Sequence, residues 1–200
     1  PELLEADLAP LVLELALWGA LPEKLKFLDP PPAAHLEKAR GLLAELGALD
    51  KDLHITPVGR GMAALPVHPR LARMLCSVPA TMVRTAADIA AVVSERDVLR
   101  PALREPWSAD IHRRLDALAL YRETREVIDR SADRAAVTRA VRVSEEIERA
   151  VAGAGRAGFG RGSSRNVRQE FETGFDWNRR DAVGAMLVLA YPDRAASRRP

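Results

Sequence analysis

The sequence predicts a mainly α-helical protein that opens with two helices and a short β-hairpin and continues as a helical bundle. Three observations indicate this fold class. Apolar residues recur at steps of three and four along most of the chain. Two short apolar pieces flank a polar turn near residue 51, and no alternation of strands with helices follows. With 48% hydrophobic and 29% charged residues, the 200-residue chain has a globular composition that can bury a core.

The first two predicted helices are each defined by one apolar face. The first face consists of Leu4, Leu8, Leu11, Leu15 and Trp18, and the second of Leu36, Ala39, Leu43 and Leu46. Gly19 and Gly47 follow these faces at the position where a left-handed residue commonly ends a helix. The connector LDPPPAAH is stiff, and its last proline can open the second helix.

A hairpin is predicted in the stretch ALDKDLHIT, with Lys51-Asp52 at its turn. Thr56-Pro57 then has the pattern of an N-cap followed by proline at the first helical position. Two helices followed by a hairpin outline a winged-helix module, in which the hairpin is the wing.

The remainder of the chain predicts further helices. TPVGRGMAAL is a short one, and Pro69 opens the next, with Leu71, Met74 and Leu75 inward. Longer helices are expected over 80–95, after an N-cap at Ser108, over 132–151 and over 180–191. Their apolar positions are Val83, Ala86, Ile89, Ala90, Val93, Ile111, Leu115, Leu118, Val137, Val141, Ile147, Val151, Val183, Met186, Leu187 and Ala190.

Charge and cysteine content restrict the class of protein. The net charge is only +2, and the cations are mostly arginine, which suits bidentate contact with phosphate or carboxylate but also follows from a GC-rich coding sequence. The single Cys76 excludes an internal disulfide framework and a cysteine-based zinc site. We find no signal peptide and no apolar run near the ~18 residues of a membrane span. These features predict a cytoplasmic location.

The stretch GAGRAGFGRG, residues 153–162, contains the G-x-G-x-x-G spelling of a dinucleotide-binding loop. That loop needs a strand before it and a helix after it. Here a charged helix precedes the glycines, and FGRGSSRN follows them. The tract is therefore interpreted as a poorly ordered linker, either solvated or touching phosphate through its arginines.

Other catalytic or metal-binding patterns are absent from the sequence. No histidine pair has the i, i+4 spacing of a helical metal site, and no G-x-x-x-x-G-K-[ST] loop is present. Arginine-rich stretches such as SERDVLRPALRE and HRRLDALALYRETR stand out instead. They fit a salt-bridged helical surface or a surface that contacts the backbone of a nucleic acid strand.

Several stretches together resemble the DEAH-box helicases. LDPPPAAHLEKARGLLAELGALD is similar to their winged helix, and ITPVGRGMAALPVHPRLARML to the start of their helicase-associated domain. IAAVVSERDVLR, RRLDAL and LVLAYPDRAASRR resemble the bacterial HrpB branch. The resemblance covers residues 1 to about 118 and returns at about 184–200, so no family role is assigned to residues 119–183.

The resemblance implies an accessory region of an ATP-dependent helicase, with a winged helix and a ratchet-like bundle that guide a single strand, RNA being favoured. No cofactor is expected in this part, because ATP and Mg²⁺ would bind the RecA-like motor domains of the parent chain. Gly59, Arg60, Pro69, Arg70 and Leu71 belong to the helicase-associated signature, Arg96 to the SERD element and Arg194 to the PDR element. The expected strand-contacting residues are Arg96, Arg194, Arg113, Arg114 and Arg70.

The predicted domains are a winged-helix module over 1–65, a helicase-associated bundle over 66–152, and a Gly/Arg-rich linker with a helix over 153–200. Two other functions stay open. The region could dock on motor domains or another partner without binding nucleic acid. It could also be a stand-alone DNA-binding regulator, which the acidic wing turn Asp50-Lys51-Asp52 disfavours.

Overall fold

The computed structural model describes residues 7–100, 109–156 and 182–194. Its elements are α1 (Ala9–Trp18), η2 (Pro22–Lys24), α2 (Ala33–Glu45), α3 (Pro57–Ala63), α4 (Pro69–Ser77), η3 (Ala80–Met82), α5 (Val83–Ser94), α6 (Ile111–Thr124), α7 (Arg134–Arg156), α9 (Ala182–Ala190) and η4 (Pro192–Arg194). The prediction of a mainly helical chain that continues as a bundle is confirmed. None of the described helices combines the length and the apolar character needed to cross a membrane.

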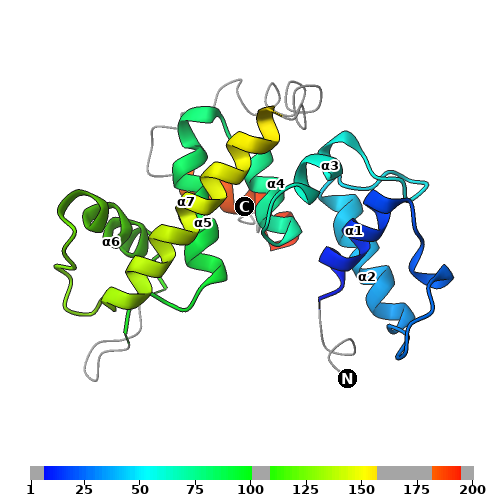
Figure 1. Cartoon of the computed structure of the whole chain (residues 1–200), viewed down its shortest axis with the longest axis horizontal. Helices are drawn as coiled ribbons and strands as arrows, with labels where there is room; N and C mark the ends of the chain where they lie inside the picture. Colours follow the sequence, from blue (N-terminus) through cyan, green and yellow to red (C-terminus); the bar gives the residue numbers. More distant parts are fainter. Residues whose placement is uncertain (1–6, 101–108, 157–181, 195–200) are drawn as a thin grey trace, which may run out of the picture.

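The helices form an elongated arrangement (Figure 1). The first three helices lie at one end, α4 is central, and α6 lies at the opposite end beside α5 and α7. α5 and α7 pack on each other, and α9 packs against α4. The N-terminal module and the bundle are therefore joined through α4.

The first two helices end as their glycines predict. Gly19 and Gly47 adopt left-handed conformations with φ of 72° and 69°. The apolar face predicted for α2 is buried along its whole length. The face predicted for α1 is only partly right, because the Trp18 side chain is 75% exposed while Val12 and Leu13 are buried.

The predicted β-hairpin is wrong: the described residues contain no strand in this loop, only one antiparallel bridge between Leu49 and Ile55. The reason is local. The Asp50 carboxylate accepts hydrogen bonds from the backbone N–H groups of Asp52 and His54, at 2.9 and 2.8 Å, which closes a tight turn. Because α3 begins at Pro57, too few residues remain to extend a second strand.

The start of α3 shows what the Thr-Pro pair contributes. The Thr56 hydroxyl accepts a hydrogen bond from Gly59 N–H at 3.0 Å and donates one to the Gly47 carbonyl at 2.7 Å. The predicted N-cap is therefore confirmed, and it also links α3 to the end of α2. Gly59 lies so close to the Ala48 carbonyl that a Cβ atom would be 2.3 Å from its oxygen.

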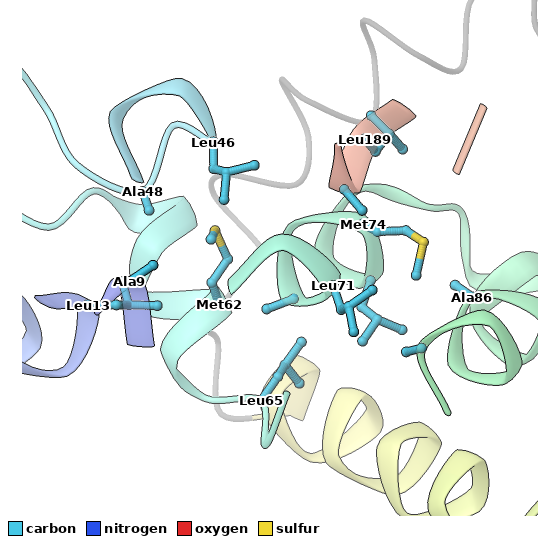
Figure 2. Close-up of a cluster of buried hydrophobic side chains, with 14 of the residues drawn as sticks. Ala9, Leu13, Leu46, Ala48, Met62, Leu65, Leu71, Met74, Ala86 and Leu189 are labelled. Atoms are coloured by element: carbon cyan, nitrogen blue, oxygen red, sulfur yellow. The ribbon is translucent and has the colours of Figure 1, made fainter. Parts of the chain in front are cut away.

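One large apolar core runs through most of the chain (Figure 2). Side chains from α1, α2, α3, α4, α5 and α9 meet in it, among them Leu13, Leu46, Met62, Met74 and Leu189. A second, smaller cluster lies where α6 packs on α7 and on the segment after α5, around Leu118 and Val137. The predicted boundaries after residues 65 and 152 remain predictions.

The second half of the chain differs from the prediction at several helix ends. Ser108 lies outside the described residues, and Asp110 is the N-cap of α6, accepting from His112 N–H at 2.9 Å. α7 extends to Arg156, so the glycine tract begins inside a helix, and its residues 157–162 lie outside the described ranges. Val93 is exposed, although it was expected on the apolar face of α5.

A buried polar group ties the three bundle helices together. Arg122 of α6 donates to both carboxylate oxygens of Asp88 on α5, at 2.8 and 2.6 Å. Ser144 of α7, which is completely buried, donates to the same carboxylate at 2.6 Å and accepts from Arg122 at 3.0 Å. The hydrogen bonds to Asp88 raise the pKa of the Arg122 guanidinium.

Candidate nucleic-acid interface

The five arginines predicted to contact a strand occupy three places in the fold. Arg70 at the start of α4 and Arg194 in η4 come together, although 123 residues separate Arg70 from its partner Asp193. Arg113 and Arg114 lie in the first turn of α6, and Arg96 lies in the loop after α5. Their environments differ sharply, from bidentate ion pairs to full exposure.

Arg70 is held by a bidentate ion pair. Its two terminal nitrogens donate to the two carboxylate oxygens of Asp193 at 2.6 and 2.9 Å, and one of them also reaches the Ala190 carbonyl at 3.3 Å. These hydrogen bonds raise the pKa of Arg70 and lower that of Asp193. The side chain of Arg70 is only 14% exposed, so its charge serves mainly to fasten η4 to α4.

Tyr191 lies beside this ion pair, directly after α9. The guanidinium carbons of Arg70 and Arg194 lie 5.1 and 5.3 Å from the centre of its ring. Both distances are within the range of cation–π contacts. Arg194 is exposed, and its backbone N–H donates to the Tyr191 carbonyl at 3.0 Å, which closes the turn that brings its side chain back to the ring.

Arg114 has a buried environment. It donates to the two oxygens of Asp97 at 3.0 and 2.6 Å and to the Asp110 carbonyl at 2.9 Å. Because its side chain is only 7% exposed, this bidentate pair joins α6 to the loop after α5. Asp97 also accepts from Leu99 N–H at 3.0 Å, so one carboxylate links Arg114 to the backbone that follows the SERD element.

Arg113 is more accessible but also engaged. It donates to Asp129 at 3.2 Å and to the Ser131 hydroxyl at 3.1 Å. Hydrogen bonds from Ser131 lower the pKa of Asp129, which keeps this carboxylate ionised beside the guanidinium. Arg113 therefore helps to hold the loop between α6 and α7.

Arg96 stands apart from the other four. It is exposed, and within the part of the chain that the structure describes no hydrogen bond, ion pair or ring contact involves its side chain. Its neighbours Asp97 and Val98 are anchored, the first by Arg114 and the second by complete burial. A fixed backbone therefore presents a solvated guanidinium at this point.

Sequence reasoning missed the acidic and aromatic partners of these arginines. Asp97 and Asp193 lie inside the SERD and PDR elements themselves, so an acid beside an arginine was the available signal. Tyr191, directly before PDR, carried a second signal, because aromatic side chains make up only 4% of the chain.

Two further groups of side chains could bind a ligand. Asp50, Asp52 and His54 could offer metal-ligating atoms within 4.8 Å of one another, but all three are exposed and Asp50 is already engaged by backbone N–H groups. Near η2, an open groove of about 230 Å³ is lined mainly by apolar side chains, including Leu25, Phe27 and Leu36. The nearby Leu28 side chain is 99% exposed.

Parts of this chain are similar to known proteins. Residues 39–67 match the helicase-associated domain (HA2), winged-helix family, and the winged-helix assignment rests on this match. ATP-dependent RNA helicase HrpB of Escherichia coli is 43% identical over 97 residues, which are 48% of this chain and 12% of that protein. The probable ATP-dependent RNA helicase DHX35 of Homo sapiens is 41% identical over 78 residues, 38% of this chain and 11% of that protein.

Solved structures give a match over the full length. The crystal structure of the E. coli DExH-box NTPase HrpB has a TM-score of 0.62 at 26% identity and covers 100% of this chain with 19% of its own. A crystal structure of the Escherichia coli DEAH/RHA helicase HrpB has a TM-score of 0.60 at 27% identity, with 20% of its chain covered. The chain thus spans a fifth or less of these relatives. Sequence and structure together support an HrpB-like accessory region of a DEAH-box RNA helicase.

Proposed function

We propose that this region contacts and guides a single nucleic acid strand, RNA being favoured, in an HrpB-like ATP-dependent helicase. The observation that carries the proposal is the contrast between Arg96 and Arg194 and the other predicted arginines. Both are exposed, and neither forms an ion pair or a hydrogen bond with a carboxylate among the described residues. They are therefore the two cations of the predicted set that are available to phosphate.

Availability matters because phosphate must compete with any internal partner. Arg70 and Arg114 each make two short hydrogen bonds to a carboxylate, and contact with a phosphate would require breaking this ion pair and moving an arginine side chain that is only 14% or 7% exposed. An exposed arginine loses only water and bound counterions when it meets a phosphate. The proposal thus keeps Arg96 and Arg194 as contacts and treats Arg70 and Arg114 as supports.

In this proposal the catalytic work belongs to another part of the parent protein. RecA-like motor domains in the same chain would bind ATP and Mg²⁺ and hydrolyse ATP. The relatives are named ATP-dependent RNA helicases. The present region would hold the strand while the motor domains move along it. A cytoplasmic site of action is part of the same proposal.

The test is to measure the equilibrium binding of a labelled single-stranded RNA to the 200-residue chain. Anisotropy of the label reports binding at each concentration of a salt series. We expect the logarithm of affinity to fall linearly with the logarithm of salt concentration. Arg96→Ala and Arg194→Ala should each lower the slope by about 0.7, the value for one phosphate contact to a single strand. Arg142→Ala, at an exposed position of α7, is the matched control and should leave the slope unchanged.

The proposal fails if the wild-type chain binds no RNA at low salt. It also fails in its residue assignment if Arg142→Ala changes the slope as much as Arg96→Ala does. A uniform loss of affinity across RNA sequences is expected for both predicted contacts, because phosphate carries no sequence information.

A second candidate function is docking on a protein, either the motor domains or another partner. One observation favours it: apolar side chains are exposed just before and after η2, and one of them, Leu25, also lines the groove. They are Trp18, Leu21, Leu25 and Leu28. On this reading, Leu28→Asp would weaken binding of separately produced motor domains and leave RNA affinity unchanged. Loss of RNA affinity in the same variant would argue against a separate docking face.

A further inference from the structure

We propose that Tyr191 and Arg194 form a subsite for one unpaired nucleotide, with the base stacked on the tyrosine ring and the phosphate beside the guanidinium. This inference rests on the proposed function, because it requires that the region meets a single strand. It adds a base-contacting residue, Tyr191, to a surface that otherwise contacts only phosphate.

The ring is held in a fixed position by charged neighbours. Arg70 lies 5.1 Å from its centre, and Arg70 is itself locked by two hydrogen bonds to Asp193. The Ala190 carbonyl, directly before Tyr191 in the chain, accepts a further bond from the same guanidinium. Tyr191 is therefore anchored on α4 through Arg70, which makes Arg70 and Asp193 positioning residues for the ring.

The second cation is held much more loosely. Within the described ranges, the Arg194 side chain forms no hydrogen bond or ion pair, and its guanidinium carbon lies 5.3 Å from the centre of the Tyr191 ring. Its side chain is exposed, and an exposed cation–π contact is weaker than the stacking of a base on an aromatic ring. A base can therefore take the place of Arg194 on the ring, while the guanidinium moves to the adjoining phosphate.

The chemistry of the pair selects a single strand. In a duplex every base is stacked and paired, and its flat face is not available to a protein side chain. An unpaired base offers that face whatever its identity, so stacking gives preference for single strands without reading sequence. The tyrosine sets this preference, and the arginine makes the contact salt-dependent.

Binding to the 200-residue chain should be measured for a single-stranded RNA of about 12 nucleotides, within the range of known single-strand sites, and for a duplex of the same length. We expect Tyr191→Leu to lower the single-strand affinity about tenfold and to leave duplex affinity unchanged. Tyr191→Phe keeps the ring and should bind as the wild type does. Trp18→Leu removes an exposed aromatic side chain at the end of α1 and is the matched control, with no change expected.

A direct readout does not depend on any variant. A 2-aminopurine placed in the single strand should lose fluorescence when it stacks on Tyr191 of the wild-type protein, and Tyr191→Phe should give the same quenching. If Tyr191→Leu proves unfolded by circular dichroism, this measurement decides the question alone. Unchanged 2-aminopurine fluorescence at every position of the bound strand would overturn the subsite.

The outcomes separate this inference from the function on which it rests. If the wild-type chain binds RNA with a clear salt slope and folded Tyr191→Leu retains full single-strand affinity, the subsite is rejected and the proposed function stands. If the wild-type chain binds no RNA at all, both are rejected. Equal losses for single strand and duplex in Tyr191→Leu would also refute the subsite, because stacking requires an unpaired base.

Discussion

Replacing Gly59 by alanine tests the tightest packing contact in the helicase-associated signature. A Cβ atom at this position would lie 2.3 Å from the Ala48 carbonyl oxygen and 2.8 Å from Cγ1 of Ile55. The carbonyl cannot simply swing away, because it accepts the hydrogen bond from Thr56 N–H at 2.9 Å. The added methyl group must therefore push α3 away from the loop that precedes it.

Three contributions set the expected change in the free energy of unfolding. Relieving the overlap by a shift of about 1 Å is an overpacking effect of about 1–3 kcal/mol, and a weakened Thr56–Ala48 hydrogen bond adds about 1 kcal/mol. Replacing a helical glycine by alanine returns about 1 kcal/mol. We expect Gly59→Ala to lower the free energy of unfolding by about 2 kcal/mol, and Tm by about 4–8 °C for a chain of this size.

Thermal unfolding followed by circular dichroism measures this effect, and Gly41→Ala is the control. Gly41 is an exposed residue of α2, and a Cβ atom there would have no neighbour within 4 Å. That variant should raise Tm by about 2–4 °C through helix propensity alone. If Gly59→Ala is as stable as Gly41→Ala, the close contact with Ala48 does not constrain the fold, and the argument is refuted.

Three further predictions concern charge and backbone. Asp88→Asn removes the ion-pair partner of Arg122, whose side chain is only 16% exposed, and should lower the free energy of unfolding by about 3 kcal/mol in urea. Arg84→Met breaks an ion pair whose arginine is 67% exposed and should change it by less than about 1 kcal/mol. Arg125→Gly should add about 1 kcal/mol in the same assay, because the exposed Arg125 has a φ of 60°. Arg70 holds the pKa of Asp193 below its ordinary 3.8, so their ion pair stabilises the chain above about pH 4. This stabilisation is lost as the pH falls through the pKa of the folded state. Asp193→Asn should therefore make the free energy of unfolding depend less on pH in the acid range.

The helices were largely predictable because their signals are local. The apolar face of α2, the Thr56 cap and the glycines after α1 and α2 are each defined by residues within one or two turns. The hairpin was not predictable in this way. Short apolar segments around a polar turn are compatible with two paired strands or with a single bridge. Here the Asp50 side chain accepts hydrogen bonds from the following backbone, which favours the single bridge.

At the end of α7 the prediction of a linker was wrong because it gave too much weight to glycine content. Gly153 and Gly155 suggested a linker, but both lie in the helix, where the space around each is open. A glycine in a helix costs about 1 kcal/mol relative to alanine. A long helix that packs along α5 and α6 offsets this cost through its buried face, so it continues through residues whose own preference is weak.

The state of each arginine could not be predicted, because it depends on a partner that is distant in sequence. Arg114 is buried because Asp97, 17 residues earlier, meets it across the loop, and Arg70 is locked by Asp193, 123 residues later. Spacing and composition treat these two residues and Arg96 alike, yet of the five predicted arginines only Arg96 and Arg194 are exposed and form no ion pair with a carboxylate of the described chain. The same acids that neutralise Arg70 and Arg114 fix the short segments that carry Arg96 and Arg194. Pairing of one arginine therefore determines where its unpaired neighbour is presented, and a charge reversal at Asp97 or Asp193 should disturb binding through Arg96 or Arg194 although neither acid would touch the strand.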